Sequence, residues 1–184
     1  MNAYLLFFLV LISSSVSSQN NERDQKIYAL FDNTVNQINT KLSYGTVYKE
    51  KYIKKIKENH NFFVTDQFKK GSINYRGEVF CNVFLKYDIV DDFIVLKILN
   101  LDGYVSIVPE KELVKSFQIE DRSFIKTEEY GFVENVFKND GFQLLKKHLK
   151  FVKENQDDKY IHHTFKIEKE TFVEIIDKAK IRNL

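Results

Sequence analysis

The chain has one cysteine, one proline and no tryptophan in 184 residues. Cys81 therefore has no partner for an intramolecular disulfide, which excludes a disulfide-stapled scaffold. The glycine patterns of phosphate-binding loops, dinucleotide-binding loops and Gly-x-Ser-x-Gly hydrolases are also missing. Acidic and basic residues nearly balance at a net charge of +2, which predicts no nucleic-acid partner.

The composition is biased towards a few residue types. Lysine outnumbers arginine 24 to 4, alanine occurs only three times, and phenylalanine and tyrosine are abundant. We interpret this as a low-GC coding bias. Lysine runs and aromatic density are therefore weak evidence for a function in this chain.

Long apolar runs are absent except at the N-terminus. Ala3 to Ile12 carries no charge and is followed by the small residues Ser13 to Ser18, which is the pattern of a secretory signal peptide. Ten helical residues rise about 15 Å, roughly half of the hydrocarbon core, so the run is too short to span a membrane. We predict a signal peptide over residues 1–18, cleaved before Gln19, and no integral membrane segment after cleavage. No cysteine stands directly after the apolar run, at the predicted mature N-terminus, which favours a soluble rather than a lipid-anchored product.

Residues 19–184 have the length of a single globular domain. We expect residues 19–24 to be disordered. An amphipathic helix is predicted over Asp24 to Lys41 from apolar residues at helical spacing, and a C-terminal helix from the capping box of Thr171 and Glu174. The apolar stripes are Ile27, Leu30, Phe31, Val35, Ile38 and Leu42 in the first helix, and Phe172, Ile175, Ile176 and Ala179 in the second.

Between these helices the apolar residues alternate with polar ones, which is typical of strands with one buried face. From Ser72 to Ile89 the apolar residues fall on odd numbers. Their constant parity favours a three-residue loop, Tyr75-Arg76-Gly77, that pairs Ile73 with Val79. Further strands are predicted at 93–101, 104–108, 114–119, 123–126, 131–138, 142–152 and 160–167. The fold class is thus α+β and β-rich: an antiparallel meander of about eight or nine strands forming a curved sheet or barrel.

Residues that could carry chemistry have simpler structural interpretations. Cys81 lies on the apolar side of the alternating segment, so we interpret it as a small core residue. His162 and His163 would point to opposite faces of a strand and would not share a metal ion. An acidic cluster between two strands lacks the EF-hand pattern and is interpreted as a polar turn: Asp88, Asp91 and Asp92.

Paired carboxylates at Glu128-Glu129 or Glu168-Glu170 could serve glycoside hydrolysis, but the sequence gives no separation between them. A lysine run is interpreted as a solvated face: Lys49, Lys51, Lys54, Lys55 and Lys57. Aromatic residues nearby fit either a ligand groove or core packing: Tyr44, Tyr48, Tyr52, Phe62 and Phe63. No catalytic, cofactor-binding or metal-binding residue is predicted, and no cofactor.

Several motifs occur in an order that resembles a known group of proteins. They are Leu42-Ser43-Tyr44-Gly45-Thr46-Val47-Tyr48, Asn61-Phe62-Phe63, the segment from Phe68 to Gly77, Val83 to Ile89, and Val114 to Phe117. This order is similar to that of exported proteins of uncharacterised function common in flavobacteria and other Bacteroidetes. The resemblance implies the periplasm or outer-membrane zone of a Gram-negative cell. It carries over no functional residue, because the group has no assigned activity.

These observations predict an exported, non-enzymatic envelope protein that acts as a soluble binding or accessory domain. Its partner would be an envelope protein or an apolar ligand. Two alternatives stay open: a carrier of a lipid or other apolar molecule in a lined cavity, and a hydrolase of envelope glycans or peptides. A subunit of an outer-membrane assembly, with an exposed apolar patch, is a further possibility.

Overall fold

The computed structural model describes residues 40–100, 103–139, 142–157, 160–167 and 171–176. The predicted signal peptide, the leader and nearly all of the predicted N-terminal helix lie outside these residues. At the end of that predicted helix, the described chain forms a single 3-10 turn, η2 (Lys41–Ser43), capped by the Thr40 hydroxyl.

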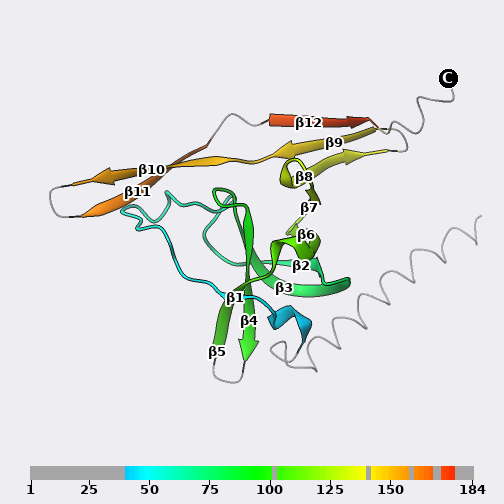
Figure 1. The fold of residues 1–184 in the computed structure, drawn as a ribbon, viewed down its shortest axis with the longest axis horizontal. Helices are drawn as coiled ribbons and strands as arrows, with labels where there is room; N and C mark the ends of the chain where they lie inside the picture. The colour runs from blue at the N-terminus through cyan, green and yellow to red at the C-terminus, as the bar shows by residue number, and fades with distance from the viewer. Residues whose placement is uncertain (1–39, 101–102, 140–141, 158–159, 168–170, 177–184) are drawn as a thin grey trace, which may run out of the picture.

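Twelve strands account for most of the described chain (Figure 1). They are β1 (Thr46–Val47), β2 (Lys69–Tyr75), β3 (Glu78–Asp88), β4 (Phe93–Asn100), β5 (Gly103–Val108), β6 (Val114–Ile119), β7 (Arg122–Thr127), β8 (Gly131–Lys138), β9 (Phe142–Lys147), β10 (Lys150–Gln156), β11 (Ile161–Ile167) and β12 (Thr171–Ile176), with a 3-10 turn η3 (Lys111–Leu113) before β6. The predicted β-rich antiparallel architecture is confirmed, and within the described residues the sheet is open rather than closed into a barrel.

The main sheet consists of two meanders joined at β2. Its strand order is β1-β5-β4-β3-β2-β6-β7-β8-β9-β12. The chain therefore leaves β5 near one edge and returns to the middle of the sheet through Pro109 and η3. Tyr75 secures this crossing, because its hydroxyl donates to the Tyr44 carbonyl (2.7 Å) and accepts from the Glu110 amide (3.3 Å).

The loop predicted between β2 and β3 is wrong by one residue. Tyr75 pairs with Glu78, so the loop has two residues, and Arg76 and Gly77 both have positive φ (52° and 81°). Such a turn matches the right-handed twist of the flanking strands. A β-bulge in β3 then returns the odd-numbered residues to the buried face. Asn82 (φ 57°) is its extra residue, between the Ser72–Cys81 and Gly71–Val83 pairs.

The predicted C-terminal helix is also wrong. Thr171–Ile176 forms β12, an antiparallel partner of β9 over six residue pairs. The capping-box pattern is overridden because Phe172, Val173, Ile175 and Ile176 favour strands, and because β9 offers them an unpaired edge.

The last four strands form two antiparallel pairs, β9 with β12 and β10 with β11. The predicted strand 142–152 is divided at His148 and Leu149 into β9 and β10. The pair β9 and β12 belongs to the main sheet, whereas β10 and β11 form a separate two-stranded sheet that extends to the left in Figure 1.

Aromatic rings fill the inner face of the sheet. Tyr87 lies at the centre, with ring centroids of Phe117, Phe124 and Phe132 at 5.3, 5.4 and 6.0 Å. Phe117 and Phe124 stack at 4.7 Å with nearly parallel planes. This cluster, together with the buried aliphatic residues of β2 to β6, makes the main core.

The irregular segment 48–68 covers part of the outer face of the sheet. Phe62 is fully buried against the Lys86 ammonium, whose Nζ lies 3.7 Å from the ring centroid. The neighbouring Phe63 turns into the aromatic core, 5.2 Å from Phe124. Core packing therefore explains both rings.

Candidate functional site

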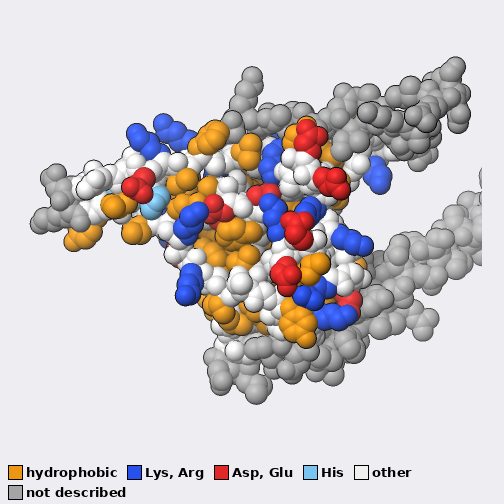
Figure 2. All heavy atoms as spheres, viewed as in Figure 1, with side chains coloured by type: hydrophobic (Ala, Val, Ile, Leu, Met, Phe, Trp, Pro, Cys, Tyr) orange, Lys and Arg blue, Asp and Glu red, His pale blue; other side chains and the backbone are white. Residues whose placement is uncertain are grey.

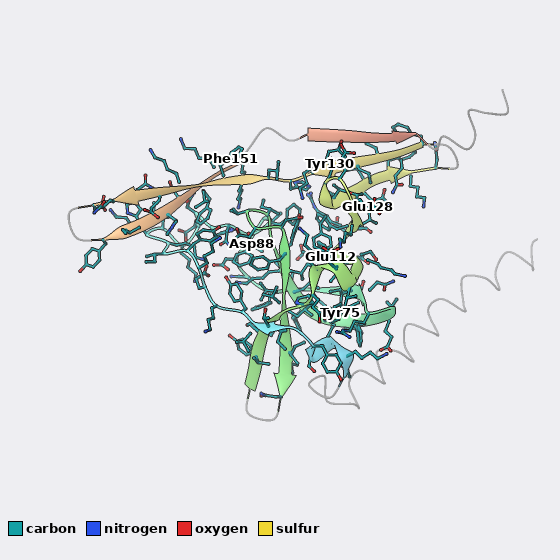
Figure 3. All side chains as sticks on the ribbon, viewed as in Figure 1. Tyr75, Asp88, Glu112, Glu128, Tyr130 and Phe151 are labelled. Carbon is teal, nitrogen blue, oxygen red and sulfur yellow. The ribbon has the colours of Figure 1, made fainter. Side chains whose placement is uncertain are left out.

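An open cleft of about 730 Å³ lies where η3, the β7–β8 turn and the β3–β4 turn meet. Charged side chains of both signs line it: Asp92, Lys111, Glu112, Lys115, Lys126, Glu128 and Glu129, with Tyr130 beside them. Figure 2 shows acidic and basic groups gathered over this side of the molecule. Figure 3 places Glu112, Glu128 and Tyr130 around the same turn.

The floor of the cleft is a partly buried ionic cluster centred on Asp92. Its carboxylate accepts from the Tyr87 hydroxyl (2.5 Å), Lys111 Nζ (2.6 Å), Lys147 Nζ (2.8 Å) and the Phe132 amide (3.4 Å). Lys147 also donates to the Phe132 carbonyl (3.0 Å). The β3–β4 turn is thereby tied to η3, β8 and β9 at one point.

Electrostatics keep the Asp92 carboxylate ionised. Burial opposes ionisation, but hydrogen bonds from Lys111, Lys147 and Tyr87 outweigh it and lower the pKa of Asp92 below its usual value. Burial lowers the pKa of Lys147, and Asp92 counteracts that shift. Burial and the Asp92 charge raise the pKa of Tyr87 well above its ordinary value, so its hydroxyl remains a donor.

Glycine is required where β8 begins beside this cluster. Gly131 has φ 65°, a conformation that side chains rarely adopt. A β-carbon there would also overlap Asp92 Oδ2. The backbone can therefore approach the Asp92 carboxylate this closely only because residue 131 is glycine.

The β7–β8 turn holds the paired carboxylates that the sequence singled out. Thr127 fixes it, since its Oγ1 accepts from the Tyr130 amide (3.1 Å) and donates to the Gly131 carbonyl (3.1 Å). Glu128 and Glu129 lie exposed at the tip of the turn. Glu129 bonds the Tyr130 hydroxyl and raises its pKa.

The opposite wall of the cleft carries an ion pair between Lys126 and Glu112. The Lys126 ammonium lowers the pKa of the Glu112 carboxyl. Lys115 is exposed and, like Glu128, has no ion pair among the described residues. The cleft therefore offers ionised groups of both signs on a rigid backbone.

The acidic cluster after β3 is a polar turn, as predicted, with a different role for each carboxylate. Asp88 Oδ1 accepts from the amides of Val90 (2.9 Å) and Asp91 (3.1 Å) and so closes the turn. Asp91 accepts from Tyr52 Oη at 2.8 Å and Lys51 Nζ at 3.0 Å, on the side of the 48–68 segment. Only Asp92 reaches the cleft. Within the described part of the chain, no cluster of His, Cys, Asp and Glu has metal-binding geometry.

The histidines lie in separate environments. His162 Nδ1 is 3.6 Å from Asp157, whereas His163 Nδ1 accepts from the Ile53 amide at 3.2 Å. His148 is buried with its Nε2 2.5 Å from Glu134. Burial lowers the pKa of His60.

Cys81 is half-buried rather than part of the core, because the bulge at Asn82 places Phe80 and Val83 inward instead. Glu168 and Glu170 lie outside the described residues. Three residues of the lysine run pair with carboxylates: Lys51 with Asp91, Lys54 with Asp66, and Lys55 with Asp157. Tyr44 stacks under Arg76, Tyr48 packs on Phe62, and Tyr52 packs on Phe165.

Sequence reasoning missed the residues that make the floor of the cleft: Tyr87, Lys111, Gly131 and Lys147. Only Gly131 carried a signal, as a glycine directly after the carboxylate pair and Tyr130. Lys111 and Lys147 are indistinguishable in sequence from the many other lysines.

Comparisons with known proteins add no family to this description. The chain matches no protein-family model, no curated protein and no solved structure. Within the described residues, no helix has the length and apolarity that crossing a membrane requires.

Proposed function

We propose that the protein is an exported, non-enzymatic binding domain of the cell envelope, and that the charged cleft holds a polar segment of a partner polypeptide. The observation that carries this proposal is the lining of the cleft. Ionised groups of both signs face an open mouth, and a polypeptide is the common ligand that carries both complementary charges.

The same groups are poorly arranged for hydrolysis. A general acid needs a carboxyl group whose pKa is raised towards neutrality. The pKa of Asp92 and that of Glu112 are lowered instead. Asp92 is also saturated by four donors, and Glu112 is paired with Lys126, which leaves neither carboxylate available as a base or nucleophile.

Carriage of an apolar molecule has less support than polypeptide binding. The inner face of the sheet is occupied by stacked rings around Tyr87. The cleft that opens beside it is lined mainly by charged groups. An apolar ligand there would strip water from those charges without compensating them.

A peptide-binding experiment tests the proposal. The exported protein is presented with a library of twelve-residue peptides, and the selected peptides are titrated by fluorescence anisotropy. We expect peptides that combine acidic with basic residues, and affinities that fall as salt is raised. Glu128→Lys/Glu129→Lys should weaken binding at least tenfold.

The matched control is Glu58→Lys/Asp121→Lys, which makes the same charge change at two exposed positions outside the cleft. Equal weakening by both pairs would contradict the proposal. So would turnover of the peptides, or a stoichiometric lipid in the protein purified from its own cells. Export itself is tested by mass spectrometry of that protein, which should begin at Gln19.

A further inference from the structure

The outer face of the main sheet is covered only in part. Near the β3–β4 turn, Phe62 of segment 48–68 packs on Lys86, and Val95, the cross-strand partner of Lys86, is fully buried. Further from that turn, side chains on the same face of β3, β4 and β5 are exposed. Its cross-strand pairs are Lys70–Phe84, Phe84–Lys97, Lys97–Ser106 and Leu99–Tyr104. We call these six residues the open face.

Large apolar side chains dominate the open face. Tyr104 is 56% exposed, Leu99 43% and Phe84 37%. They are direct or diagonal neighbours on adjacent strands, so their exposed areas adjoin. Adjoining exposed apolar side chains on one sheet face are a feature of interaction surfaces.

The charges on the open face are all positive. Lys97 Nζ lies 4.3 Å from the Tyr104 ring centroid and 6.0 Å from that of Phe84. Neither Lys97 nor Lys70 has an ion pair among the described residues, and none of the six residues is acidic. The rings hold the Lys97 ammonium in place, but they do not neutralise it.

We propose that the open face docks on an anionic membrane surface. Leucine and aromatic side chains suit the boundary between headgroups and acyl chains, and the two ammonium groups would meet lipid phosphates. An acidic polysaccharide is favoured less, because Leu99 and Phe84 offer it no hydrogen bonds. This docking is separate from the polypeptide binding proposed for the cleft.

Vesicle co-sedimentation of the full exported chain tests this inference. The probes are vesicles of phosphatidylglycerol and phosphatidylethanolamine, vesicles of phosphatidylcholine alone, and soluble polygalacturonate. We expect binding to the anionic vesicles that declines at high salt. Lys97→Gln should reduce the partition coefficient about fivefold, the equivalent of one lysine at an anionic surface.

Leu99→Ser/Tyr104→Ser should reduce the partition further. Lys97, Leu99 and Tyr104 are at least partly exposed, so we expect the variants to fold, and circular dichroism checks this. The matched control, Ile56→Ser/Lys57→Gln, removes one exposed apolar group and one exposed lysine elsewhere and should leave binding unchanged. Glu128→Lys/Glu129→Lys should not weaken it either, which separates this inference from the cleft.

Three results would overturn the inference. The first is partition into anionic vesicles no greater than into phosphatidylcholine. The second is an equal loss in the Ile56/Lys57 control. The third is binding of polygalacturonate that depends on Lys97 and Tyr104 while vesicle binding does not.

Discussion

Replacing Asp92 by asparagine removes the charge that neutralises Lys147 in the floor of the cleft. The Lys147 side chain is only 10% exposed, so its ammonium would stay buried beside a neutral amide. Breaking a buried ion pair by removing one partner costs about 3–5 kcal/mol. We expect Asp92→Asn to lower the free energy of unfolding by about 3 kcal/mol, the lower end of this range, because asparagine still accepts one hydrogen bond from Tyr87 or Lys111.

A double variant shows whether this loss comes from the stranded ammonium. In Asp92→Asn/Lys147→Met no buried charge remains, so the destabilisation should be smaller than the sum of the two single variants by about 1–3 kcal/mol. Urea unfolding at pH 7, followed by circular dichroism, measures each free energy, provided that the slope with urea is unchanged. A cost below about 1 kcal/mol for Asp92→Asn, or strict additivity, would refute the account of the cluster.

Two further predictions concern residues around the same sheet. Gly131→Ala should lower the free energy of unfolding clearly more than Gly77→Ala. Both positions have positive φ, but of the two only Gly131 would bring a β-carbon against another atom, Asp92 Oδ2. Equal losses of unfolding free energy in urea would disprove the close contact. Lys150 donates to the carbonyls of His60 (2.8 Å) and Phe62 (2.6 Å), and burial lowers its pKa to about 8. Because the unfolded chain binds the Lys150 proton more tightly, the free energy of unfolding should rise between about pH 8 and 10.5. Lys150→Met should remove this rise in unfolding curves. NMR of methylated lysines should give one titration midpoint near pH 8.

The strands were largely predictable because alternating apolar and polar residues indicate which face of a strand is buried. β6 and β8 were predicted at their observed bounds, and β4, β5, β7 and β11 to within one residue at either end. The β2–β3 loop was not, since a constant parity is produced equally by a three-residue loop or by a two-residue loop followed by a bulge. The conformation of Asn82 decides between them, and sequence does not report it.

The candidate site was predictable only where its residues are neighbours in sequence. Glu128 and Glu129 were singled out because they are adjacent, and the turn keeps them together. The fold brings together three residues that lie up to 55 positions apart in the sequence: Asp92, Lys111 and Lys147. Helix or strand preference was also insufficient at residues 171–176, where the free edge of β9 decided the outcome.

The contacts between residues 53–59 and β11 make the order of synthesis relevant to folding. Asn59 donates to the Phe165 carbonyl at 2.8 Å and accepts from its amide at 2.7 Å, and His163 pairs with the backbone of Ile53. The contacts of Ile53 and Asn59 with β11 therefore form only after more than a hundred further residues have been made. Until then Tyr52, which is buried in the fold and packs on Phe165, lacks this cover, and exposed apolar groups in an incomplete chain are where aggregation begins.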